Sequence, residues 1–263
     1  MQALTSSESG RVTIMDATGK RPRLGVLGGM GPLATAVFYN RLVDEAKLTA
    51  RKDQDHPDVL IWSDCSLPDR TEVILHGDDG SLLKQCERDF ALLKQAGCDY
   101  ICFPCNTLHY FMPQLEQLTD LPILNMVELA LKSVRKLHPS AEKLQIFATE
   151  GTRQGKLYER YAKRYGFEIV PVPDPLQQEI MGFIYDLKNS GCVDFPLLSQ
   201  RIIEAREQGV DYVILACTEL SCMTLNAKAA CLVYDAMDAL ISRCLELVMP
   251  GQNKLENKGR NSL

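Results

Sequence analysis

The sequence has little that marks a membrane protein, a secreted protein or a nucleic-acid-binding protein. None of its apolar runs approaches the length that spans a bilayer, and residues 1–20 lack the basic-then-apolar order of a secretory signal. No lysine-rich block occurs before the short C-terminal tail, and the net charge of the 263 residues is −5. We therefore expect a cytoplasmic chain that binds neither a membrane nor a nucleic acid.

Two common ligand-site patterns are also incomplete. The glycines within Gly25–Gly31 do not fall in the G-x-G-x-x-G register of a dinucleotide site. Cys102 and Cys105 form a C-x-x-C, but no second pair with ligand spacing follows, and on a strand their side chains point to opposite faces. We expect neither a cofactor nor a metal ion. The strand–glycine–helix order around Gly25–Gly31 is instead typical of a site for an anion such as phosphate or carboxylate.

Cysteine is not scarce, since the chain has ten, but we expect no disulfides. The cysteines are scattered through predicted strands and helices, and a chain of this length can build a hydrophobic core without covalent crosslinks. We expect a reduced chain in which most cysteines are small buried apolar groups.

The main feature that is present is a repeat containing a cysteine. GCDYICFPCNTLHYF at Gly97–Phe111 returns as GVDYVILACTELSCM at Gly209–Met223, and a gapless alignment places Cys105 on Cys217. The apolar run before each cysteine has the length of a strand and is apolar on both faces, as in parallel strands buried between helices. Each cysteine then lies at the C-terminal end of a strand, where open α/β sheets bind their ligands. The repeat therefore predicts two thiols at one cleft.

Strands alternate with helices along the whole chain, and the opening LGVLGGMGP is echoed by KLQIFATEGT in the second half. This order predicts an α/β fold of two pseudo-symmetric, doubly wound parallel-sheet domains with the active site in the cleft between them. The expected divisions are a disordered extension at 1–20, a first domain at 22–125 plus 231–249, a second domain at 126–230, and a polar tail at 250–263.

Two facing thiols are suited to proton transfer at a carbon acid. Backbone N–H dipoles at a following helix favour the thiolate. One thiolate can then remove an α-proton while the opposite thiol delivers a proton to the other face, which suits a substrate and product that are mirror images. Nucleophilic catalysis by a single cysteine is the alternative and needs a base. His109 is the histidine nearest to either cysteine in sequence, and packing or hydrogen bonding competes with a catalytic role for it.

Arg70 lies in a polar loop after a predicted strand, within SLPDRT. As a surface arginine it needs no explanation. At the C-terminal edge of a sheet, however, its guanidinium could hold a carboxylate with two parallel hydrogen bonds. Both readings stay open at this point.

Five motifs occur in order along the chain: GVLGGMGPLAT at Gly25–Thr35, LPDRT at Leu67–Thr71, PCNTLH at Pro104–His109, ATEGT at Ala148–Thr152 and ACTEL at Ala216–Leu220. On these motifs, from about Arg23 to Val248, the chain resembles the aspartate/glutamate racemase family, and specifically its aspartate racemase branch. The resemblance implies an isomerase that works without pyridoxal phosphate and acts on a small-molecule amino acid, with aspartate or glutamate preferred. A homodimer is common in that family.

The resemblance also implies a set of site residues. Cys105 and Cys217 match the two acid/base residues of the family. Arg70 would hold one carboxylate, hydroxyl and amide groups would hold the other carboxylate and the ammonium, and Glu219 would orient the second half-site. The matched substrate-binding positions are Met30, Arg70, Asn106, Thr107, Thr149, Thr152, Thr218 and Glu219.

The chain departs from the family pattern at two places. Asn125 stands where the family often carries a histidine, and no histidine follows Asp235. These departures leave open the substrate preference and the tuning of each cysteine. The alternatives to an aspartate or glutamate racemase are a broad-specificity racemase, another isomerase of the superfamily that acts on a carbon acid (hydantoin racemase or maleate isomerase-like), and a non-catalytic ligand-binding relative. The presence of both cysteines favours racemisation among these.

Overall fold

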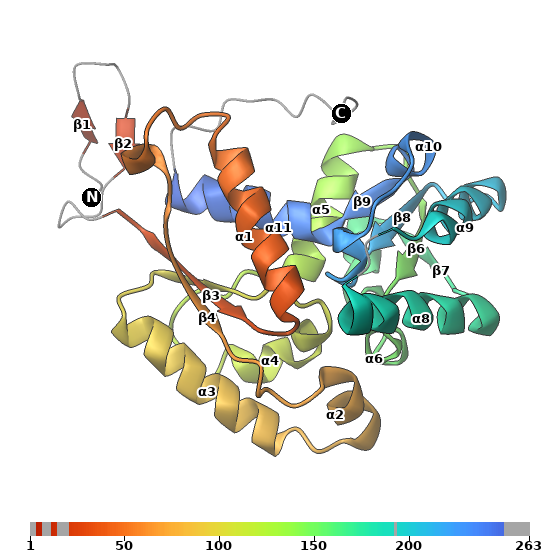
Figure 1. Cartoon of the computed structure of the whole chain (residues 1–263), viewed down its shortest axis with the longest axis horizontal. Coiled ribbons are helices and arrows are strands. Elements are labelled where there is room, and N and C mark those ends of the chain that lie inside the picture. Colours follow the sequence, from red (N-terminus) through yellow and green to blue (C-terminus); the bar gives the residue numbers. More distant parts are fainter. Residues whose placement is uncertain (1–3, 7–11, 15–20, 192–193, 250–263) are drawn as a thin grey trace.

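Two parallel sheets, one in each half of the chain, form the framework of the molecule (Figure 1). The computed structural model describes residues 4–6, 12–14, 21–191 and 194–249. The first sheet has the strand order β4-β3-β5 and the second has the order β7-β6-β8-β9, with every neighbouring pair parallel. The strands are β3 (Arg23–Gly28), β4 (Asp58–Ser63), β5 (Tyr100–Cys102), β6 (Lys143–Phe147), β7 (Glu168–Val170), β8 (Tyr212–Leu215) and β9 (Val233–Asp235).

Helices connect the strands and cover both sheets. The α-helices are α1 (Pro32–Ala46), α2 (Arg70–His76), α3 (Gly80–Gln95), α4 (Met112–Leu115), α5 (Met126–Leu137), α6 (Glu150–Gln154), α7 (Glu159–Ala162), α8 (Asp174–Ser190), α9 (Pro196–Glu207), α10 (Ala227–Ala230) and α11 (Ala236–Val248). Short 3₁₀ turns occur at η1 (Asp53–Asp55), η2 (Thr107–Phe111), η3 (Lys163–Tyr165) and η4 (Leu220–Cys222). The fold is the two-domain parallel α/β architecture that the alternation of strands and helices predicts.

The sequence repeat corresponds to a structural repeat. The order β4-β3-β5 in the first sheet matches β7-β6-β8 in the second. In the first half, a single parallel bridge from Ile101 to Ile123 takes the place beside β5 that β9 has beside β8 in the second half.

The Gly-x-Asp that opens each copy of the repeat has a local structural role. Gly97 and Gly209 adopt φ values of 75° and 90°, a left-handed conformation that glycine adopts without steric cost. The carboxylate of Asp99 accepts a hydrogen bond from the backbone N–H of Arg23 at 2.7 Å. The carboxylate of Asp211 accepts one from the backbone N–H of Lys143 at 2.9 Å. Each Gly-x-Asp therefore turns the chain and fastens it to the start of the central strand of its own sheet.

One hydrophobic core joins the halves. Leu24 and Val26 of β3 belong to the same buried cluster as Leu144 of β6 and Ile214 of β8, together with side chains of α1, α5 and α11. Leu27, one residue beyond Val26, points to the other face and packs in a second cluster with α3. Figure 1 shows α1 and α3 on opposite faces of the first sheet, and α11 between α1 and α5.

The C-terminal segment differs from the expected division. Residues 231–249 were assigned to the first domain, but β9 pairs with β8 and so completes the second sheet. Only α11 turns back, where it contacts α1, α5 and β3. The assignment was wrong for the strand, because the direct connection through α10 leaves β9 beside the free edge of β8.

The ends of the chain are described only in part. Strands β1 (Leu4–Ser6) and β2 (Val12–Ile14) pair antiparallel within the segment expected to be disordered. The rest of 1–20, and the expected polar tail at 250–263, lie outside the described residues. Among the helices of the described ranges, none is long and apolar enough to cross a membrane.

Candidate active site

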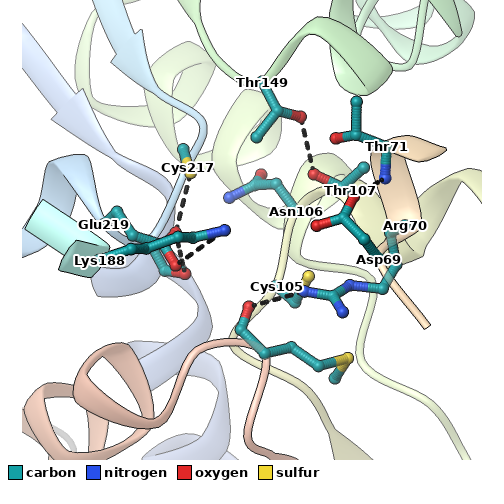
Figure 2. A pocket seen from close by; sticks show the side chains of 12 residues that line it. Asp69, Arg70, Thr71, Cys105, Asn106, Thr107, Thr149, Lys188, Cys217 and Glu219 are labelled. Atoms are coloured by element: carbon teal, nitrogen blue, oxygen red, sulfur yellow. Dashed lines mark hydrogen bonds and ion pairs between the residues drawn. The ribbon is translucent and has the colours of Figure 1, made fainter. Parts of the chain in front are cut away.

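The two repeated cysteines open onto one pocket. Cys105 follows β5 and Cys217 follows β8, both at the C-terminal edges of their sheets, and each is 5% exposed. Figure 2 shows their side chains on two sides of a shared space. The space between the protein atoms, counted together with the open solvent at its mouth, measures about 300 Å³. The tertiary fold thus brings together two thiols that are 112 positions apart, which is 217 minus 105.

The pocket lining includes nearly all the residues that the motifs suggested. Every predicted site residue except Thr152 lines it. Asp69, Thr71 and Lys188 line it as well and were not predicted. Asp69 and Thr71 flank Arg70 in LPDRT, so the motif could have suggested them. Lys188 lies near the end of α8, outside every motif, and only the folded chain places it there.

Thr152 acts one layer behind the pocket. Its hydroxyl donates to Thr107 Oγ1 at 3.2 Å and accepts from Thr149 Oγ1 at 3.2 Å, while the hydroxyls of Thr107 and Thr149 are 2.9 Å apart. All three side chains are buried. This ring of hydroxyls joins η2 of the first half to α6 of the second half, and Thr149 also caps α6. It holds the two hydroxyls that line the pocket in place.

The Cys217 end carries a carboxylate. The Cys217 thiol donates a hydrogen bond to Glu219 Oε2 at 2.9 Å, and Lys188 Nζ lies 3.8 Å from Glu219 Oε1 (Figure 2). Burial and the neighbouring Glu219 charge raise the pKa of the Cys217 thiol well above its usual range. The sequence pattern favoured a thiolate at both cysteines, but at Cys217 these two effects outweigh the backbone dipoles.

The Cys105 end carries a guanidinium instead. Arg70 lies against the Cys105 sulfur and donates to the backbone carbonyl of Pro68 at 3.0 Å. Burial lowers the pKa of Arg70, but the charges of Cys105 and Asp69 reverse this, so the pKa is raised overall and the guanidinium stays charged. Asp69 caps α2 by accepting from the backbone N–H of Thr71 at 2.8 Å. The cap fixes the start of the helix from which Arg70 reaches into the pocket.

His109 supports the Cys105 backbone from behind the pocket. Its Nε2 accepts from the backbone N–H of Met126 at 3.0 Å, so Nδ1 carries the proton and donates to the Cys105 carbonyl at 2.9 Å. The ring is 1% exposed, and burial lowers its pKa to about 4. His109 is therefore a neutral hydrogen-bonding residue, and of the two roles considered for it the structure supports hydrogen bonding.

Asn125, and Asp235 just before the second departure from the family pattern, have structural roles. Asn125 caps α5, accepts from the backbone N–H of Glu128 at 3.1 Å, and donates to Tyr161 Oη at 3.0 Å. Asp235 caps α11 and accepts from Ser221 Oγ at 2.7 Å. Neither lines the pocket. Within the described ranges, no group of three His, Cys, Asp or Glu side chains is placed to hold a metal ion.

Two parallel sheets that each deliver a thiol to one polar pocket define a two-domain α/β protein built around paired cysteines. Residues 27–244 match the model of the Asp/Glu/Hydantoin racemase family. This match covers most of the chain, and the protein belongs to that family. Family membership makes it an isomerase of the racemase type.

Individual relatives agree with this assignment. The broad specificity amino-acid racemase RacX of Bacillus subtilis (strain 168) is 29% identical over 221 residues, which cover 82% of this chain and 94% of RacX. The aspartate racemase of Picrophilus torridus is 26% identical with a TM-score of 0.71, covering 86% of this chain and 93% of that one. The glutamate racemase of Francisella tularensis, solved with D-glutamate, shares the fold at 16% identity and a TM-score of 0.61, covering 92% and 85%.

Proposed function

We propose that the protein racemises acidic amino acids by transferring protons between Cys105, the substrate α-carbon and Cys217. The observation that carries the proposal is that both thiols line one pocket from opposite halves of the molecule. A thiolate on one side takes the α-proton, and the C–H electron pair is left on the carbon and its carboxylate. The thiol on the other side then gives its proton to the opposite face. The configuration is inverted, and the two sulfurs have exchanged their protonation states.

The charges around the two thiols support different resting states. Cys217 faces the Glu219 carboxylate, which favours the protonated thiol, whereas a negative charge on Cys105 faces the Arg70 guanidinium. Because burial and Glu219 raise the pKa of the Cys217 thiol, Cys217 is the proton donor of the first turnover and Cys105 the proton acceptor. After one turnover the arrangement is reversed, and solvent exchange restores it.

Two cations in the lining support a dicarboxylic substrate. Arg70 Nε is buried and has no hydrogen-bond partner among the described residues, so it is free to donate to a ligand. Lys188 Nζ lies 3.8 Å from its carboxylate neighbour Glu219, which is too long for a hydrogen bond. With these two cations the pocket offers a separate positive group to each carboxylate of aspartate or glutamate.

A broader specificity is the second candidate. It is favoured by RacX, the relative described by its printed name as a broad specificity amino-acid racemase. In that case Lys188 would serve mainly Glu219, and neutral side chains would be accepted.

The test follows α-proton exchange by NMR in D2O, beside chiral chromatography, for a panel of L-amino acids without added pyridoxal phosphate. We expect D-product and exchange to appear together and to be fastest for aspartate or glutamate. Equal rates for neutral amino acids would favour the broad candidate, and no exchange with any amino acid would refute the proposal.

Two variants test the role of the thiols. Cys105→Ala and Cys217→Ala should each abolish racemisation and leave exchange with retention for one enantiomer only, because the remaining thiol serves a single face. Cys98→Ala is the matched control, since Cys98 belongs to the same repeat and is 4% exposed but does not line the pocket. Full racemisation by either pocket variant would rule out the two-thiol mechanism.

A further inference from the structure

A buried tyrosine from the second half of the chain reaches the residue next to Cys105. Tyr158, immediately before α7, is 1% exposed, and its hydroxyl donates to Asn106 Oδ1 at 2.6 Å. Asn106 is 2% exposed and lines the pocket beside both thiols (Figure 2). The Asn106 amide is thus one of the points at which the second half binds the Cys105 loop.

The hydrogen bond determines which way round the amide lies. Among the described residues, the Tyr158 hydroxyl has no other hydrogen-bond partner. Burial raises the pKa of Tyr158 well above its usual range, so the phenol keeps its proton and must donate it. A buried hydroxyl left without an acceptor is destabilising, because it has lost its hydrogen bond to water and gained none in return. The Asn106 oxygen therefore faces Tyr158, and its NH2 group faces the other way.

The NH2 group of Asn106 is available to a ligand. Nδ2 is buried and has no hydrogen-bond partner in the described part of the chain. Figure 2 shows the amide directed into the space between Cys105 and Cys217. Buried donors are rarely left unpaired in native proteins unless a ligand or water completes them. An acceptor on the substrate would complete this one.

We propose that Tyr158 is a positioning residue of the reaction, which holds the Asn106 amide with its NH2 group turned toward the substrate carboxylate. This inference rests on the proposed function. Negative charge moves onto that carboxylate when the α-proton leaves, and a fixed donor aimed at the charge lowers the barrier. If the amide turned over, it would present a carbonyl oxygen to the same charge. Tyr158 excludes the turned-over state.

The kinetic test compares three single variants. Loss of one such donor typically costs 10²–10³-fold in kcat, so we expect a loss of roughly 100-fold for Asn106→Ala. We expect roughly tenfold for Tyr158→Phe, because the amide then samples both orientations. Tyr161→Phe is the matched control: its hydroxyl accepts from Asn125, another tyrosine–asparagine pair, but it does not line the pocket.

A double variant separates positioning from general packing. If Tyr158 acts through Asn106, Tyr158→Phe in the Asn106→Ala background causes no further loss of kcat. Multiplying losses in the double variant, or a Tyr158→Phe enzyme as active as Tyr161→Phe, would overturn the inference.

An NMR measurement reads the amide without turnover. The side-chain NH2 signals of Asn106 are identified by their loss in Asn106→Ala. We expect them to move on adding L-aspartate and to change in Tyr158→Phe but not in Tyr161→Phe. Unchanged signals in Tyr158→Phe would overturn the positioning role. The failure of the proposed function is distinct, because it would show as wild-type protein without exchange or racemisation.

Discussion

Glu219→Gln should move the pH dependence of racemisation in a direction that the site geometry dictates. The carboxylate of Glu219 accepts the hydrogen bond of the Cys217 thiol at 2.9 Å. A thiolate and a carboxylate about 4 Å apart repel by roughly 4 kcal/mol at an effective dielectric constant of about 20. Lys188, at 3.8 Å from Glu219, offsets part of this repulsion. If about 2 kcal/mol remains, its removal changes the ratio of thiolate to thiol roughly 30-fold.

The sign follows from the protonation state that the reaction needs. The active enzyme holds one thiolate and one thiol, so activity is lost when the second thiol ionises. Burial and Glu219 raise the pKa of Cys217, which keeps that thiol protonated to high pH. Without the carboxylate, Cys217 ionises at lower pH, and the alkaline limb of the profile moves down by roughly one to two pH units.

The assay is kcat/KM for aspartate as a function of pH. Because the equilibrium constant of a racemisation is one, kcat/KM is equal in both directions, and a single profile suffices. Glu207→Gln, which removes an exposed carboxylate away from the pocket, is the control. An alkaline limb that stays in place in Glu219→Gln would refute the assignment of Cys217 as the resting proton donor.

Two further changes test the packing around the site. A Cβ on Gly151 would lie 2.9 Å from Thr71 Cα, so Gly151→Ala must push α6 away from α2. We expect the variant to lose about 1–3 kcal/mol of stability, measured by thermal unfolding, and to have a lower kcat/KM. Gly182→Ala has open space and is the control; equal stability of both variants would contradict the close approach. Burial raises the pKa of Asp89 to about 6. The protonated carboxyl therefore stabilises the fold fully at pH values below the ordinary pKa of aspartate, and this stabilisation is lost as the pH rises through about 6. Trp62, the only tryptophan, donates to Asp89 at 3.1 Å, so its fluorescence should titrate near this pH in the wild type and not in Asp89→Asn; a flat wild-type titration would contradict the shift.

The placement of both thiols could be predicted because it depends on local patterns. An apolar run of strand length, a turn glycine before it and a cysteine after it occur twice, and parallel strands deliver their C-terminal ends to the same edge of a sheet. Arg70 was predicted from its place in a polar loop after a strand, whereas Thr149 was predicted only from the resemblance to the racemase family.

Lys188 and Thr152 show that local sequence patterns do not predict which side chains reach the pocket. Lys188 reaches the pocket from the last turns of α8, and its distance from Glu219 depends on how α8 packs on the second sheet. Thr152 matched a motif position but bonds to the hydroxyls behind the pocket, because α6 turns its side chain toward η2. Side-chain direction on a short helix depends on what the helix packs against.

The sequence by itself determined the α/β class, the repeat and the two cysteines at equivalent strand ends, because hydrophobic periodicity and turn chemistry act over a few neighbouring residues. Only the tertiary structure decided that the two ends of the site differ, with Glu219 and Lys188 beside Cys217 and Arg70 beside Cys105. It alone also decided that Tyr158 holds the Asn106 amide across the halves. Charge and hydrogen bonding depend on distances of a few ångströms between segments far apart in sequence, and those distances exist only once the two halves have packed together.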